Sequence, residues 1–209
     1  MILLAAIIVL ILSIILHEVA HGYVADWLGD PTARYSGRLT LNPLSHIDPM
    51  GSIIIPGILI LTNSPFLIGW AKPVPYNPYN LKNQRWGEAL VAGAGPATNI
   101  LLAVLFGQLV HFAGALNLSP DILTVCATAV FANLTLAIYN LIPIPPLDGS
   151  KVLRSLLPYG GRMAFGRFEQ SMYALGAFGL IVVALLVLYL LWPVLSSILG
   201  WLFVLVTSF

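Results

Sequence analysis

Long uninterrupted stretches of apolar residues dominate the chain and set the expectation for its fold. Four of them have about the 20 residues that a helix needs to cross a bilayer core of about 30 Å. We expect these spans near residues 2–28, 87–112, 121–142 and 171–191. Pro193 is expected to separate off a shorter apolar segment, 194–209, that folds back or lies at the membrane interface. The pattern predicts an all-α polytopic membrane protein.

A further apolar stretch, residues 51–71, has a less regular pattern. Pro56, Gly57 and Pro65 interrupt it, and residues 52–55 read as a strand. Irregular backbone at membrane depth is tolerated only where protein or a wet cavity covers it. We therefore predict a small membrane-embedded β or re-entrant element over about residues 36–70, within one domain of residues 1–209.

The composition supports the membrane assignment and excludes several function classes. Hydrophobic residues make up 59% of the 209 residues and charged residues only 8%, far below the quarter or so typical of soluble domains. A formal net charge of +1 offers no basic surface for nucleic acid. Cys126 is the single cysteine, which excludes an intramolecular disulfide and any multi-cysteine metal site.

The positions of the basic residues indicate an orientation in the membrane. If segment 51–71 enters the bilayer and returns, all nine Lys and Arg lie on one side, and the connection 113–121 has none. Cytoplasmic loops are enriched in Lys and Arg, so we expect this side of the cell membrane to be cytoplasmic and the N-terminus extracytoplasmic. The basic residues are Arg34, Arg38, Lys72, Lys82, Arg85, Lys151, Arg154, Arg162 and Arg167.

The first predicted span contains His17-Glu18-Val19-Ala20-His21, a sequence of the form H-E-x-x-H. Two histidines four residues apart on a helix differ in direction by about 40°, so both imidazoles can bind one metal ion, for which zinc is suited. Glu18 is placed to take a proton from water as a general base. The alternative is an interhelical network of buried polar residues, but ionisable residues inside a span are usually functional.

A catalytic zinc site usually has three protein ligands and one open position, so a third ligand is expected. Asp148 is favoured, because the prolines of the segment 140–149 hold the chain extended where the third span ends. A re-entrant segment 51–71 brings this point to the same side of the membrane as His17 and His21. The alternative is that Asp148 only forms a turn before a glycine.

Other candidate ligands fit less well. His46 and Asp48 lie in a proline-rich connection from which either could reach the metal, so they stay as alternatives. Asp26 points to the opposite side of the first span from His17, and His111 lies near the far end of its own span.

Two asparagines inside predicted spans are candidates for binding a substrate carbonyl or an oxyanion. Asn99 follows the small residues 93–97, which permit a close helix approach, and Asn140 ends the third span. Ordinary interhelical hydrogen bonds explain both residues equally well.

Three motifs together make the chain resemble the site-2 protease family of intramembrane zinc metalloproteases: HEVAH, GAGPATN and NLIPIPPLDG. The resemblance implies one zinc ion per chain bound by His17, His21 and Asp148, with Glu18 activating water. It also implies that Asn99 and Asn140 assist carbonyl binding. The region 37–55 is similar to the family's membrane-embedded β-hairpin, and the chain resembles the compact branch because it has no inserted PDZ-type domain.

These features predict a zinc metalloendopeptidase that cleaves transmembrane segments near the cytoplasmic leaflet, in regulated proteolysis or in the removal of signal-peptide remnants. Its expected partners are substrate transmembrane helices and lipid, and the sequence does not indicate an oligomeric state. The alternative function is a metal-ion or proton transporter that uses the same His, Glu and Asp residues. No internal repeat of the transporter kind is visible.

Overall fold

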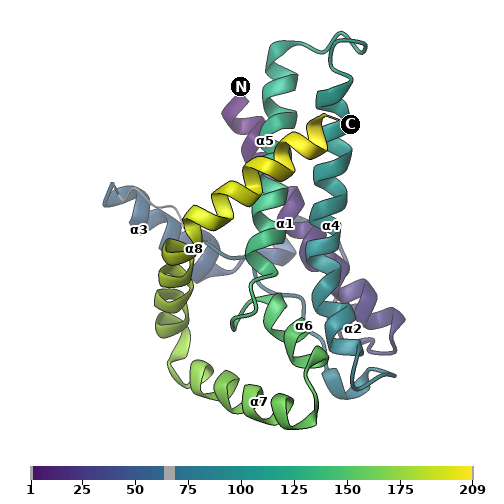
Figure 1. Cartoon of the computed structure of the whole chain (residues 1–209), viewed down its shortest axis with the longest axis vertical. Coiled ribbons are helices and arrows are strands. Elements are labelled where there is room, and N and C mark those ends of the chain that lie inside the picture. Colours follow the sequence, from purple (N-terminus) through teal and green to yellow (C-terminus); the bar gives the residue numbers. More distant parts are fainter. Residues whose placement is uncertain (1, 64–68, 209) are drawn as a thin grey trace.

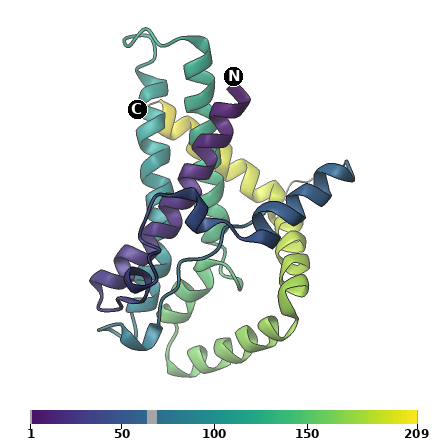
Figure 2. The same ribbon diagram turned by 180° about the vertical axis from the view of Figure 1, so that it is seen from behind.

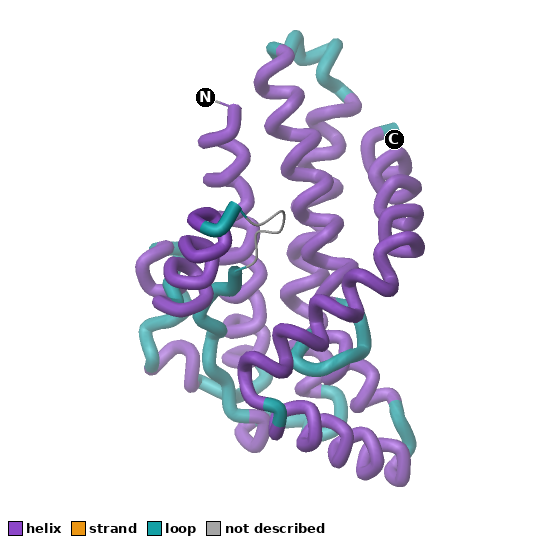
Figure 3. Tube along the Cα trace, turned by 90° about the vertical axis from the view of Figure 1, so that its left-hand side faces the viewer, coloured by secondary structure: helices purple, strands orange, loops and turns teal. Residues whose placement is uncertain are grey.

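The computed structural model describes residues 2–63 and 69–208, and every regular element within them is a helix (Figure 3). The prediction of a mainly α-helical fold is confirmed. The elements are α1 (Ile2–Trp27), α2 (Thr32–Tyr35), η1 (Pro43–His46), η2 (Pro49–Ile54), α3 (Ile55–Leu61), η3 (Pro78–Asn80), α4 (Gly87–His111), α5 (Pro120–Asn140), α6 (Asp148–Leu156), α7 (Tyr159–Ala174) and α8 (Gly176–Thr207).

Helices α1, α4 and α5 form the centre of the molecule (Figures 1 and 2). Helices α4 and α5 are antiparallel neighbours, and α1 packs against both of them. Large apolar side chains such as Leu3, Leu4 and Ile8 are exposed on α1, while its inner face buries His17 and His21. This reversal of the usual soluble pattern fits a helix surrounded by lipid. With the C-terminal part of α8, four helices among residues 2–63 and 69–208 are long and apolar enough to cross a membrane.

The C-terminal region differs from the prediction of a span at 171–191 followed by a separate segment. The helix break lies at Gly176, which has a φ of +68° in the left-handed region that glycine tolerates. Helix α8 then continues past Pro193, and its direction changes along its length (Figure 1). An interior proline removes one hydrogen bond and kinks a helix without necessarily ending it. The fourth candidate span is therefore Tyr189–Thr207.

The predicted β element is also corrected, because residues 2–63 and 69–208 contain no strand. Residues 52–55, which read as a strand, continue from the π-helical turn η2 into α3. The cause is a helix-start signal: the Asp48 side chain accepts a hydrogen bond from Gly51 N at 2.7 Å, and Pro49 occupies the first helical turn. The local cap outweighs the β-propensity of three successive isoleucines.

The two ends of this segment nevertheless lie together. Trp70 N donates to Gly51 O at 3.1 Å, and Lys72 N donates to His46 O at 2.9 Å. A β-carbon on Gly51 would lie 2.3 Å from the Trp70 ring, so only glycine permits this contact. The chain thus leaves the helical body near residue 48 and returns to the same place near residue 70.

A buried carboxylate at the end of α1 organises the connection that leads to α4. Asp30 is completely buried and accepts hydrogen bonds from Thr32 Oγ1 at 2.5 Å, Asn77 N at 2.6 Å and Asn80 Nδ2 at 2.8 Å. Lys82 N also donates to Leu28 O at 2.9 Å. These contacts fix residues 77–82 beside the end of α1.

We expect the substitution Asp30→Asn to lower the free energy of unfolding by about 1–3 kcal/mol near neutral pH, because buried donors lose an acceptor. Burial raises the pKa of Asp30, but the hydrogen bonds from Thr32, Asn80 and Asn77 outweigh it and leave this pKa below the ordinary value of 3.8. A lowered native pKa stabilises the fold above the unfolded-state pKa, and this stabilisation is lost as the pH falls. Thermal unfolding in detergent at decreasing pH is the measurement.

The difference between wild type and Asp30→Asn should shrink below pH 3.8. Asp26→Asn is the control, since Asp26 pairs with an exposed arginine, Arg34, and should contribute about 1 kcal/mol or less. A difference for Asp30→Asn that does not change with pH would contradict the prediction.

Candidate metal centre

The two histidines of the HEVAH motif lie one turn apart on the buried face of α1. His17 Nδ1 lies 2.5 Å from Asn99 Oδ1 on α4, and His21 Nδ1 lies 2.6 Å from the carbonyl oxygen of Val91, also on α4. Both partners are acceptors, so each Nδ1 carries the proton and donates it. The two Nε2 atoms are left as bare acceptors, 3.1 Å apart. This is the tautomer that binds a metal ion.

Asn99 belongs to a buried chain of hydrogen bonds across three helices. Its Nδ2 donates to Asn133 Oδ1 on α5 at 2.8 Å, and Asn133 Nδ2 donates to Ser13 Oγ on α1 at 2.9 Å. Both asparagines are completely buried. The sequence analysis missed Asn133, although a lone amide in an apolar span must find a partner and so gives a signal.

The third member of the cluster is Asp148, the first residue of α6. Its Oδ2 lies 3.3 Å from the Nε2 atoms of both His17 and His21. The loop between α5 and α6 brings it there, and this loop is tight at Gly149, where a β-carbon would lie 2.2 Å from the carbonyl oxygen of Leu141. Three ligand atoms from α1 and α6 therefore converge on one point.

The spacing of these atoms fits a zinc ion. Ligands about 2.0–2.2 Å from a tetrahedral zinc lie about 3.3 Å from one another, and the three separations here are 3.1, 3.3 and 3.3 Å. Gly95 on α4 covers the site, because a β-carbon there would lie 2.5 Å from each Nε2. His17, His21 and Asp148 could thus hold a metal ion, and Gly95 leaves the room for it.

The charge around Asp148 favours its ionised form. Burial alone raises the pKa of Asp148, and the nearby ammonium group of Lys151 lowers it. Lys151 Nζ lies 4.0 Å from Asp148 Oδ1 and 5.4 Å from the centre of the Tyr76 ring. A carboxylate that stays ionised is the form that binds a metal cation.

Glu18 lies in the same cavity as the cluster, which has a volume of about 200 Å³. Val74 N donates to Glu18 Oε2 at 3.0 Å, so a segment from the connection before α4 holds the carboxylate. Arg38 stabilises this segment, because its Nη2 donates a hydrogen bond to Lys72 O at 2.7 Å. Glu18 keeps a fixed direction beside the histidines, as a general base requires.

Asn140 also lines this cavity, and its Nδ2 donates to Leu136 O at 3.0 Å in the same helix. Its position is compatible with the predicted contact to a substrate carbonyl. Asn99 is different, since the hydrogen bonds to His17 and Asn133 occupy its amide. Asn99 therefore lies where its amide oxygen orients the His17 ring.

The alternative third ligands are engaged elsewhere. His46 Nε2 bonds to Thr40 O at 2.8 Å, and Asp48 caps η2. Asp26 pairs with Arg34, and His111 lies at the end of α4 against Phe112, with ring centres 4.6 Å apart. Asp148 is the residue that reaches both histidines.

Comparison with known proteins agrees with this geometry. Residues 109–183, which include Asp148, match the sequence profile of Peptidase family M50. The chain is 38% identical over 199 residues to the Bacillus subtilis (strain 168) protein named "Putative zinc metalloprotease YwhC", covering 91% of this chain and 85% of that protein. The chain belongs to peptidase family M50, the site-2 protease family.

A longer protein is also similar to this chain. The chain is 34% identical over 143 residues to "Putative zinc metalloprotease Rip2" of Mycolicibacterium smegmatis (strain ATCC 700084 / mc(2)155), and the matched region covers 66% of this chain and 52% of that protein. No solved structure matches the chain. Its helices and its family together make this M50 protein a multi-pass membrane protein.

We expect Gly95→Ala to weaken zinc binding by about 100-fold or more, because its methyl group would occupy the space beside both Nε2 atoms. Gly93→Ala is the matched control on the same helix, since a β-carbon there meets no atom within 4 Å. Competition with a zinc chelator measures the affinities. Equal affinities in the two variants would show that the metal does not lie beneath Gly95.

The substitution Asn99→Leu tests whether Asn99 orients His17 or binds substrate. Loss of the contact to His17 Nδ1 should weaken zinc binding about 10- to 100-fold, as is usual when the hydrogen-bond partner of a metal ligand is removed. Asn140→Ala, the comparison variant, should retain zinc. If Asn99→Leu keeps wild-type zinc affinity and only loses activity, the orienting role is wrong.

Proposed function

We propose that this protein is an intramembrane zinc endopeptidase that hydrolyses peptide bonds in the transmembrane segments of other membrane proteins. The convergence of His17, His21 and Asp148 beside Glu18 supports this proposal most strongly. The three ligands leave one side open to the cavity, as catalytic zinc sites do. Regulated intramembrane proteolysis and the removal of signal-peptide remnants are the processes in which such an activity would act.

The proposed reaction divides its tasks among residues that line one cavity. Zinc, when bound, lowers the pKa of water and polarises a carbonyl group. Glu18, held by Val74 N, takes the proton from the attacking water and passes it to the leaving amine. Asn140 is placed to contact the substrate carbonyl. Burial of the histidines excludes water from their far side and keeps their hydrogen bonds intact.

We propose the orientation with the N-terminus outside and the metal centre toward the cytoplasmic leaflet. The elements that carry the basic residues, among them α2, α6 and α7, gather at the end opposite the α4–α5 turn (Figure 1). The bias of cytoplasmic loops toward Lys and Arg supports this side as cytoplasmic. Asp148 begins α6 near this same end.

The segment between residues 49 and 70 is proposed to enter the membrane and return. The apolar helical stretch Pro49–Leu61 is too short to span a bilayer. The hydrogen bond between Trp70 N and Gly51 O joins its two ends. Because this region has no strand within the described residues, a substrate would not find a preformed sheet edge there. Local unwinding of the substrate must still expose its peptide carbonyls.

We expect Glu18→Gln to lower the cleavage rate about 10²- to 10⁴-fold without loss of zinc. Glutamine keeps an oxygen that accepts from Val74 N, so the fold should be preserved. The measurement is cleavage of a reconstituted single-span substrate together with zinc content. Asp121→Asn, at the exposed start of α5, is the control and should cleave at the wild-type rate.

The same preparation distinguishes the transporter alternative. Liposomes that contain the wild-type protein should cleave the substrate and show no zinc or proton flux. Flux without cleavage, or full cleavage by Glu18→Gln, would contradict the proposed function.

A further inference from the structure

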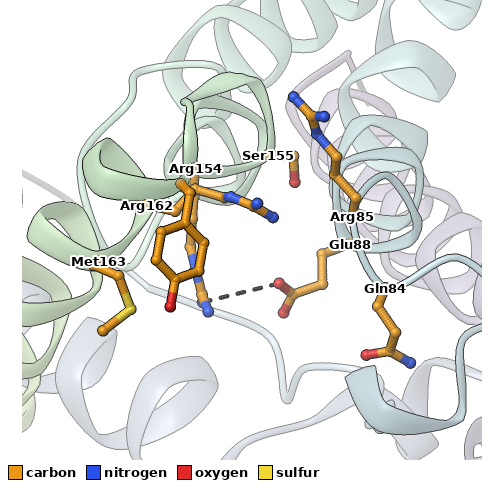
Figure 4. A pocket seen from close by; sticks show the side chains of 8 residues that line it. Gln84, Arg85, Glu88, Arg154, Ser155, Arg162 and Met163 are labelled. Atoms are coloured by element: carbon orange, nitrogen blue, oxygen red, sulfur yellow. Dashed lines mark ion pairs between the residues drawn. The ribbon is translucent and has the colours of Figure 1, made fainter.

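A second cavity, of about 220 Å³, lies between α4, α6 and α7 and is separate from the metal centre. Figure 4 shows the side chains of Arg85, Arg154 and Arg162 gathered around it, with Glu88 among them. Gln84, Ser155 and Tyr159 add further polar groups to its lining. Three guanidinium groups around one hollow call for an anion or for enough carboxylates to neutralise them.

Among the described residues, the carboxylates near the cavity form ion pairs with Arg154 and with neither of the other two arginines. Arg154 Nη1 lies 3.3 Å from Glu169 Oε2 and 3.9 Å from Glu88 Oε2. Within the part of the chain that the structure describes, neither Arg85 nor Arg162 has an ion pair. Three arginines and two carboxylates leave one net positive charge at the cavity.

The side chain of Arg162 gives the clearest indication that the cavity binds a ligand. Its Nε is buried and has no hydrogen-bond partner among the described residues. A buried donor without a partner is unfavourable, and native structures usually satisfy such groups. The Nε and Nη atoms of a guanidinium form a fork that matches two oxygens of a phosphate.

The position of the cavity indicates where the phosphate comes from. Glu88 lies in the first turn of α4, a candidate membrane span, so the cavity lies at a membrane surface. Trp86 and Tyr159 are exposed beside it, as aromatic residues often are at the lipid headgroups. Met163, which lines the cavity, is exposed and offers an apolar surface to acyl chains.

We propose that this cavity binds a phosphate ester, supplied by the headgroup of an anionic phospholipid. The phosphate oxygens bond to Arg162 and Arg85, while Arg154 keeps its contacts with the two glutamates. Basic pockets between membrane helices are suited to this kind of ligand. The proposal is independent of peptide cleavage, because it concerns a cavity that none of His17, Glu18 or Asp148 lines.

Native mass spectrometry of the full chain released from detergent tests the proposal. Wild type should retain phosphatidylglycerol in preference to phosphatidylcholine with the same acyl chains. Arg162→Gln and Arg85→Gln should each weaken retention about fivefold, and the double variant about 25-fold. Arg167→Gln is the matched control, because Arg167 is an exposed arginine on the same helix and does not line the cavity.

Titration with inorganic phosphate separates the two possible sources. Displacement of phosphatidylglycerol by phosphate, with the same dependence on Arg162, supports a phosphate site filled by lipid. Binding of inorganic phosphate without any preference for the anionic lipid would overturn the lipid source. Equal retention by Arg162→Gln and Arg167→Gln, in variants whose unfolding temperature and zinc content match wild type, would overturn the site itself.

Discussion

The hydrogen bond between His17 Nδ1 and Asn99 Oδ1 is the contact on which the geometry of the candidate metal centre depends. It directs Nε2 of His17 toward the metal centre and joins α1 to α4. Through Asn133 and Ser13 the same chain of hydrogen bonds fixes α5. Inside a bilayer each of these groups would be costly to leave unpaired. The three helices therefore pack in the arrangement that satisfies all of them, and that arrangement orients the ligands.

Asp148 completes the centre from outside this helical core, and its delivery depends on close backbone contact. Gly149 lies against the Leu141 carbonyl, and Gly95 lies against the two imidazoles. Both contacts exclude a side chain, at Gly149 because of the backbone of the loop before α6 and at Gly95 because of the two imidazoles. Helix α6 then continues from Asp148 to Arg154, so one short helix connects the metal centre with the arginine-lined cavity.

Glu18, the proposed general base, depends for its position on the connection between α1 and α4. Glu18 is held by Val74 N, and the segment that contains Val74 is anchored at its other end by buried Asp30. Arg38 secures it through Lys72 O. Glu18 is thus held by a connection whose own position depends on buried hydrogen bonds, which gives a structural role to residues far from the candidate metal centre.

The sequence by itself determined the helical membrane fold, the spans α1, α4 and α5, and the HEVAH candidates, because span length and the spacing of the two histidines are local patterns. Asp148 was a candidate because of the proline-rich segment that presents it and the side of the membrane expected for that segment. It did not determine that Asn99 bonds to His17, that Asp48 caps a helix in place of binding metal, or that α8 continues through Pro193. The role of Asp30 and the arginine cavity were also not predictable from the sequence, and Asn133 was recognisable only as an amide in need of a partner, without the identity of that partner. These depend on pairings between residues distant in sequence, and only the packed chain decides which partner satisfies each buried polar group.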